Sequence, residues 1–182
     1  MADDVPIQWM DRTGTVTALR AAPANWSNPA FSPDGRRLAV DISTTQTDVF
    51  VYDWARNTLT RTTFDTNTDT RPVWTPDGQR LVFRSNRDKS FNLYWQRADG
   101  SGDVQRLTDS QNSQVPASWH PSGKFLAFHE ARPDTNNDLM ILPMEGDEAS
   151  GWKPGTPTVF RSTPFAELER RGWYVPPERL LG

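Results

Sequence analysis

Short apolar runs recur along the chain, and none holds a helical period for three turns without a Pro or Gly interrupting it. Runs at 38–40, 49–52 and 81–83 are bounded by turn-forming Pro, Gly, Asn and Asp residues. Runs of this length with such boundaries are typical of β-strands. The pattern therefore predicts an all-β protein, with only a short helical turn expected at 166–171.

A turn motif occurs three times between expected strands. The first copy is Pro29-Ala30-Phe31-Ser32-Pro33-Asp34-Gly35, followed by an apolar run, and the other copies span 72–83 and 117–128. In each copy a proline presets φ, an Asp or Ser side chain closes the turn, and glycine takes a positive φ. The motif predicts a tight hairpin that follows a strand ending in an aromatic residue.

The spacing of the three motifs predicts the architecture. Their glycines, Gly35, Gly78 and Gly123, recur with a period of about 43 to 45 residues. A period in the forties with several short strands per unit is typical of a β-propeller blade. We therefore expect four-stranded antiparallel blades, in which the third and fourth strands include residues 49–52 and 59–64, 93–95 and 104–108, and 139–142 and 158–161.

The period divides residues 1–182 into a single propeller domain of about four blades. Residues 7–11 and 16–19 predict two strands of a first half blade, and 173–181 resembles a degraded copy of the motif. The expected units are a half blade at 5–22, blades at 23–65, 66–110 and 111–163, and a degenerate half blade at 164–182.

Two routes to a closed ring follow from this division. The two half blades could combine into a fourth blade within one chain, or two chains could join into a ring of about eight blades. Unpaired strand edges and open apolar faces favour self-association, and a two-fold dimer is the commonest oligomer. We therefore expect a homodimer.

Composition narrows the class of protein further. The chain contains 8 Trp and 9 Phe, which predicts a core built from large rings. Its net charge of −3 argues against a general nucleic-acid surface. No run is long enough to span a membrane, and the acidic start is unlike a signal peptide, so we expect a soluble protein of the cytoplasm or periplasm. The absence of Cys excludes disulfides, cysteine-ligated metals and thiol catalysis.

The three motifs resemble the TolB-type, WD-repeat-like β-propeller repeat. The stretch 81–88, followed by Leu93-Tyr94 and Arg106-Leu107-Thr108, matches that repeat along most of its length. The resemblance covers roughly residues 5–165 and implies the propeller fold. Similar arrays occur in TolB, in the gate domains of prolyl oligopeptidase-like and tricorn-like peptidases, and in sensor halves of bacterial serine/threonine kinases. The kinase-associated and peptidase-associated arrays are the most similar.

The sequence contains no motif typical of catalysis, such as Gly-x-Ser-x-Gly, a P-loop or a dinucleotide fingerprint. We expect His120 to be a hydrogen-bonding residue of its hairpin, and His129 to be a polar residue facing a loop. The acidic stretches 65–69 and 134–138 lack EF-hand spacing, so we interpret them as polar turns. No catalytic residue, metal or cofactor is expected.

The expected recognition surface lies at one rim of the propeller. Asn28 and Arg71 precede equivalent inner strands, which predicts that their side chains lie near the channel mouth, and Arg87 and Asp88 complete the set. The leading hypothesis is a non-enzymatic module that binds a protein or peptide, or acts as a scaffold, and completes its ring by self-association. The alternatives are a truncated gate or sensor propeller of a peptidase or serine/threonine kinase, and a small hydrolase or lyase that uses rim carboxylates and His129.

Overall fold

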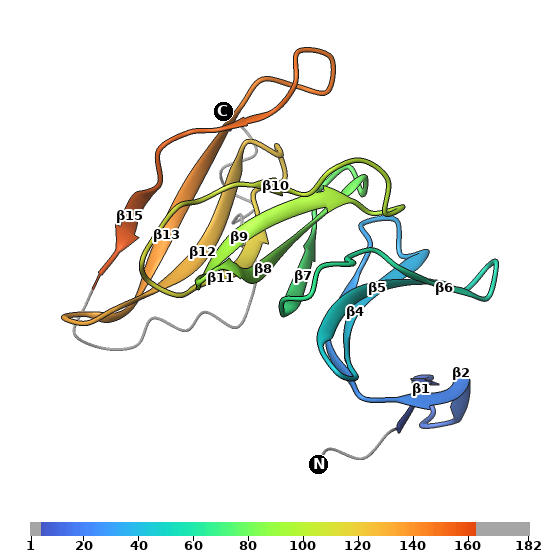
Figure 1. Cartoon of the computed structure of the whole chain (residues 1–182). Helices are drawn as coiled ribbons and strands as arrows, with labels where there is room; N and C mark the ends of the chain where they lie inside the picture. The colour runs from blue at the N-terminus through green and yellow to red at the C-terminus, as the bar shows by residue number, and fades with distance from the viewer. Residues whose placement is uncertain (1–4, 163–182) are drawn as a thin grey trace.

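The computed structural model describes residues 5–162, in which every regular element is a β-strand (Figure 1). This confirms the all-β class. Within that range there is no helix that could cross a bilayer. The predicted helical turn at 166–171 and the degenerate half blade at 164–182 lie outside the described residues.

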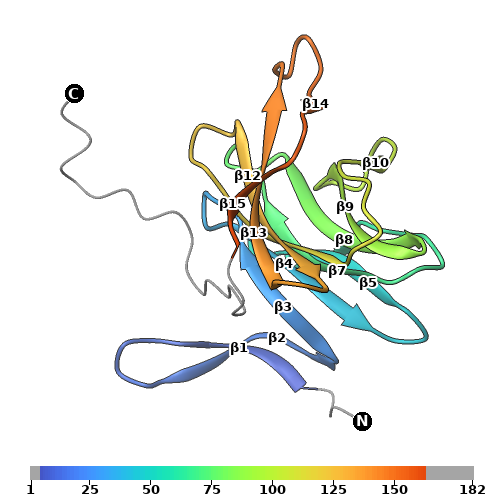
Figure 2. The ribbon, with the colours of Figure 1, turned by 90° about the vertical axis from the view of Figure 1, so that its left-hand side faces the viewer.

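Three antiparallel sheets follow one another in chain order, and the strands within each sheet are neighbours in sequence (Figures 1 and 2). The first sheet contains β3 (Trp26–Phe31), β4 (Arg37–Ser43), β5 (Thr47–Asp53) and β6 (Thr58–Arg61). The second contains β7 (Asp69–Trp74), β8 (Arg80–Asp88), β9 (Ser90–Arg97) and β10 (Gln105–Arg106). The third contains β11 (Gln114–Trp119), β12 (Phe125–Arg132), β13 (Asn136–Glu145), β14 (Lys153–Pro154) and β15 (Thr158–Arg161).

The third sheet has five strands where four were expected. The long strand β13 pairs with β14 at Met144 and Glu145, and with β15 between Leu139 and Ile141. Ten residues of β13 provide enough edge for two short partners in succession. The fourth-strand position of this blade is therefore shared by two strands.

The motif forms the predicted hairpin in all three copies. Each glycine has a φ of 68° to 72°, and its N–H donates to the carbonyl three residues earlier at 2.8 to 2.9 Å, the pairs being Gly35 with Ser32, Gly78 with Thr75, and Gly123 with His120. Asp34 and Asp77 each accept a hydroxyl hydrogen bond at 2.6 Å. In the third copy His120 Nδ1 and Ser122 Oγ lie 2.8 Å apart, which confirms the hairpin role of His120.

Apolar side chains fill the space between successive sheets. On β8, Leu81 and Phe83 belong to a buried cluster shared with the first sheet, whereas Val82 belongs to a cluster shared with the third. The same alternation places Leu126 and Phe128 of β12 against the second sheet. Because neighbouring strand residues point to opposite faces, successive residues of one strand pack against different neighbouring sheets.

The aromatic residue of each motif shows how strongly the sheets depend on their neighbours. Trp74 is 6% exposed, and its Nε1 donates to the carbonyl of Ala30 in the first sheet at 2.8 Å. Trp119 is 8% exposed, so both tryptophans are core residues as expected. Phe31 has the same position but is 55% exposed, because among the described residues no full sheet precedes the first one.

A hairpin covers part of the open face of the first sheet. It consists of β1 (Val5–Met10) and β2 (Val16–Ala24), which pair antiparallel to each other and form a separate sheet (Figure 2). Ile7 packs against the buried cluster of the first sheet, and the Trp9 ring meets the Phe31 ring edge-on at 6.4 Å. The residues assigned to a first half blade thus form a hairpin that contacts the first sheet through side chains.

We expect Trp74→Ala to lower the free energy of unfolding by about 3–5 kcal/mol, because it leaves a cavity between two sheets. The matched control Phe31→Ala removes an aromatic side chain at the equivalent, exposed position and is expected to cost less than about 1 kcal/mol. Urea unfolding followed by circular dichroism measures both. Equal losses in the two variants would contradict this account of sheet packing.

Candidate functional site on the inner strands

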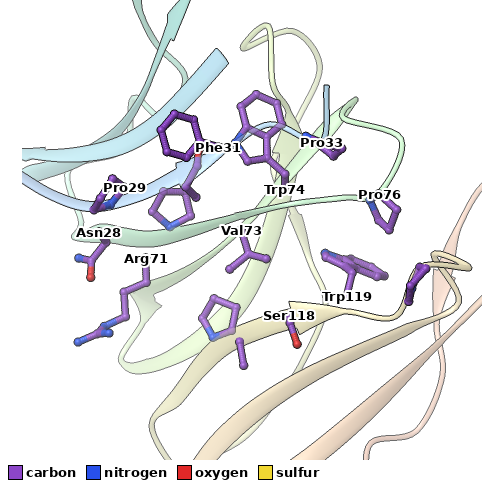
Figure 3. Close-up of a pocket in the computed structure, with 15 residues that line it drawn as sticks. Asn28, Pro29, Phe31, Pro33, Arg71, Val73, Trp74, Pro76, Ser118 and Trp119 are labelled. Carbon is purple, nitrogen blue, oxygen red and sulfur yellow. Dashed lines mark hydrogen bonds between the residues drawn. The ribbon is translucent and has the colours of Figure 1, made fainter. Parts of the chain in front are cut away.

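The innermost strands of the three sheets, β3, β7 and β11, line a common hollow of about 680 Å³ (Figure 3). In a propeller the innermost strands surround the central channel, so this hollow is the described part of that channel. The lining is contributed by equivalent positions of the three motifs: Asn28, Pro29, Ala30, Phe31, Pro33, Arg71, Pro72, Val73, Trp74, Pro76, Pro116, Ala117, Ser118, Trp119 and Pro121.

Prolines dominate the lining for a structural reason. The channel-facing edge of an innermost strand has no partner strand, and an unpaired edge invites pairing with another chain. Pro29, Pro72 and Pro116 place residues without an N–H in these three strands, which reduces the unpaired donors of the edge. The proline rings also present rigid apolar surface to the hollow.

Asn28 and Arg71 lie together at one end of the hollow, and Pro33 and Pro76 lie toward the other (Figure 3). The sequence had predicted that these two polar residues precede the inner strands. In the structure they lie within β3 and β7. Both have a positive φ, 48° at Asn28 and 58° at Arg71, and the strand register shifts at both positions. A left-handed conformation costs a non-glycine residue about 1–2 kcal/mol, so other contacts must hold it.

Asp41 provides those contacts. It is buried on β4, where Oδ1 accepts the backbone N–H of Arg71 at 3.2 Å and Oδ2 accepts the Asn28 amide at 3.1 Å. The Thr70 hydroxyl donates to Oδ2 at 2.8 Å. Asp41 therefore connects the first sheet to β7 of the second. Our sequence interpretation did not select it, although an acidic residue directly after the apolar run 38–40 was a usable signal.

Arg84 has the position in the second repeat that Asp41 has in the first. Arg84 is part of β8 and lies opposite Thr70 of β7, and its guanidinium carbon is 4.3 Å from the centre of the Phe91 ring. Burial and the nearby charge of Arg71 lower the pKa of Arg84, whereas Asp41 opposes this shift. In the part of the chain that the structure describes, neither Arg71 nor Arg84 has a carboxylate within ion-pair distance.

Arg87 and Asp88 have contacts within the second sheet and do not line the hollow. The Arg87 guanidinium binds both Asp69 oxygens at 3.1 Å and lies 4.7 Å from the Tyr94 ring centre. Burial raises the pKa of Asp69, and the charge of Arg87 opposes that shift. Asp88 accepts the Tyr94 hydroxyl at 2.6 Å and forms an ion pair with Arg106 at 3.4 Å. The structure therefore brings together only Asn28 and Arg71 of the four expected rim residues.

The other polar candidates also have definite places. His129 lies within β12, buried, opposite Val115 and Leu139, so the prediction that it faces a loop was wrong. The strand continues four residues beyond the apolar run 125–128, which the sequence pattern did not indicate. Asp69 from the first acidic stretch begins β7. Residues 5–162 contain no group of three or more His, Cys, Asp or Glu side chains that could hold a metal ion.

Successive four- and five-stranded antiparallel sheets, joined by the repeated hairpin and facing a common hollow with their innermost strands, define a β-propeller protein. The chain belongs to the TolB β-propeller domain family, which matches residues 4–153. The resemblance inferred from the motifs is thereby confirmed.

Individual relatives agree with this assignment. The chain is 26% identical to the TolB of Acinetobacter baumannii, with a TM-score of 0.66 over 84% of this chain and 38% of that one. It is 30% identical over 107 residues to the Agrobacterium fabrum protein Atu1656, covering 58% of this chain and 36% of that protein. It is 27% identical over 108 residues to the Bacillus subtilis peptidase YuxL, covering 55% of this chain and 16% of YuxL. The chain thus spans well under half of these relatives.

We expect Arg87→Met to lower the free energy of unfolding by about 3–5 kcal/mol at neutral pH, because it leaves the buried Asp69 carboxylate unpaired. The loss should grow as the pH rises above about 4, because only the charged form of Asp69 suffers from the missing Arg87, and in the folded variant the pKa of Asp69 is raised further than burial already raises it in the wild type. The neighbouring control Asp88→Asn, at an exposed carboxylate, should cost less than about 1 kcal/mol. Urea unfolding across this pH range measures both, and a loss independent of pH would argue against an unpaired Asp69.

Proposed function

We propose that the chain is a non-enzymatic module that binds a protein or peptide, or acts as a scaffold, through the hollow of its inner strands. The observation that carries this proposal is the hollow itself, which combines proline and tryptophan surfaces with the exposed Arg71 at one end. Membership of the TolB β-propeller family supports it. Large rings and an arginine are the side chains that contribute most to protein interfaces.

The walls of the hollow suit recognition without large rearrangement. The backbone is restricted at six lining prolines, and the lining rings Trp74 and Trp119 are fixed between sheets. A site that is already ordered loses little conformational entropy when a ligand binds. An extended peptide laid across the three strands would contact prolines and rings first, and polar groups at the end near Asn28.

We expect peptides selected from a phage-displayed random library against this protein to lose at least about tenfold in affinity when Ala117→Trp fills the hollow. The matched control Thr60→Trp adds the same side chain at an exposed position on β6, away from the hollow, and should bind as the wild type does. Isothermal titration calorimetry with the synthesised peptides measures both. Unchanged affinity for Ala117→Trp, or a selection without enrichment, would refute binding in the hollow.

We propose further that two copies of the chain complete one ring of about eight blades. The first sheet and its hairpin leave apolar side chains exposed, including Trp9 at 51%, Phe31 at 55% and Met10 at 67%. Clustered exposed rings of this kind are typical of interaction surfaces.

Size-exclusion chromatography with light scattering tests this pairing. We expect a mass twice that of the 20.6 kDa chain, and a shift toward the monomer when Phe31→Ser and Trp9→Ser are combined. A strict monomer at high protein concentration would instead support closure of a small ring within one chain, by the two half blades.

A second candidate is a gate or sensor propeller that accompanies the catalytic domain of a peptidase or serine/threonine kinase. The match to YuxL over only 16% of that peptidase favours it. An antibody against this chain should then detect a product well above 20.6 kDa in cells of the source organism. The hydrolase or lyase alternative gains no support, since His129 is buried within β12. The location of the protein in the cytoplasm or periplasm also stays a prediction.

A further inference from the structure

We propose that Arg71, which lines the polar end of the hollow, and Arg84, which lies beside it on β8, form a carboxylate-binding subsite that binds an acidic group of the peptide. This inference rests on the proposed function, because the peptide is the molecule that brings the carboxylate into the hollow. It adds a requirement that the fold does not impose: the bound peptide must carry a negative charge at one defined place.

The two arginines are neighbours across β7 and β8. Arg84 pairs directly with Thr70 in the strand register, and Arg71 is the next residue of β7. The Arg71 side chain is exposed and lines the end of the hollow that Asn28 also lines (Figure 3). The charge of Arg71 acts on the Arg84 guanidinium, which lowers the pKa of Arg84 and agrees with their closeness.

The nearby carboxylate does not neutralise this pair. Both oxygens of Asp41 are occupied by neutral donors, namely the Arg71 backbone N–H, the Thr70 hydroxyl and the Asn28 amide. Neither guanidinium lies within ion-pair distance of Asp41 or of any other carboxylate in residues 5–162. One negative and two positive charges therefore meet here, and a carboxylate from outside would balance them.

Arg84 is held in place but lacks a polar partner. Its guanidinium stacks at 4.3 Å on the Phe91 ring, and its Nε is buried without a hydrogen-bond acceptor. The planar guanidinium fork matches the two oxygens of a carboxylate, and ring stacking fixes its orientation in advance.

The remainder of the hollow favours a peptide as the source of this carboxylate. From Arg71 the lining continues along proline, valine and tryptophan surfaces to Pro76 and Pro121. Such surfaces suit an extended chain with apolar side chains. The carboxylate comes either from an Asp or Glu side chain or from the peptide C-terminus, and the experiment separates these two sources.

The test uses glutarate as the carboxylate probe and follows the arginine Nε–H signals in two-dimensional proton–nitrogen NMR spectra. We expect saturable shifts of the Arg71 and Arg84 signals with glutarate and none with the neutral analogue glutaramide. Arg71→Gln should weaken binding by about tenfold, as expected for the loss of one charge-assisted contact. The control Arg56→Gln, at an exposed arginine that is paired with Asp53, should leave it unchanged.

Arg84→Lys is the second variant, because it keeps the charge and removes the fork, and it should also weaken glutarate binding while the protein stays folded by circular dichroism. Shifts that do not saturate, or that persist equally in Arg71→Gln, would overturn the proposal. Tighter binding of inorganic phosphate than of glutarate would overturn the assignment to a carboxylate.

The selected peptides supply the second arm. Replacing Glu or Asp by the amide, or amidating the C-terminus, should reduce affinity for the wild type about tenfold but leave affinity for Arg71→Gln unchanged. The change that has this effect identifies the source of the carboxylate. If neither the amide replacement nor the C-terminal amidation reduces affinity, and the peptides still bind Ala117→Trp more weakly than the wild type, the subsite fails while the proposed function stands. If the peptides do not bind in the hollow at all, the proposed function fails, and glutarate alone decides the subsite.

Discussion

The packing of each sheet against the sheet before it is the interaction on which the rest of this structure depends. Trp74 shows it most clearly, because it is buried against the first sheet and hydrogen-bonded to the Ala30 carbonyl. Arg37 adds a second link, with its guanidinium 4.6 Å from the Trp74 ring centre and bonded to the Gly78 carbonyl at 2.7 Å. Where a preceding sheet is missing, as at Phe31, the same motif position is left exposed. Whether the aromatic residue of the motif is buried thus depends on the presence of a preceding sheet.

The same arrangement produces the hollow. Stacking the sheets around their inner strands brings three equivalent positions side by side, so that Asn28 and Arg71 lie at one end and Pro33, Pro76 and Trp119 lie toward the other (Figure 3). Asp41 fixes the polar end, because it bonds to both of these residues and to Thr70 across the boundary between two sheets. The strained backbone at Arg71 is therefore held from the neighbouring repeat, whereas Asn28 is bound by Asp41 of its own sheet, and the binding surface is a property of the assembled sheets.

Features that depend on local chemistry could be predicted from the sequence, and features that depend on contacts between different strands could not. The Pro33-Asp34-Gly35 turn closes through its own side chains, so the hairpin and the repeat period were predictable. The pairing of Arg87 with Asp69 joins residues from different strands, so Arg87 was assigned to the rim. Arg84 was missed because its importance comes from Arg71 and Phe91 beside it, which no local pattern indicates.

Hydrogen–deuterium exchange with a selected peptide tests most directly whether the inner strands form the binding surface. The account predicts that the peptide slows exchange at the backbone amides of β3, β7 and β11, above all near Asn28 and Arg71, and leaves the outer strands β6 and β10 unchanged. Protection confined to the outer strands, with unchanged exchange on the inner ones, would contradict it.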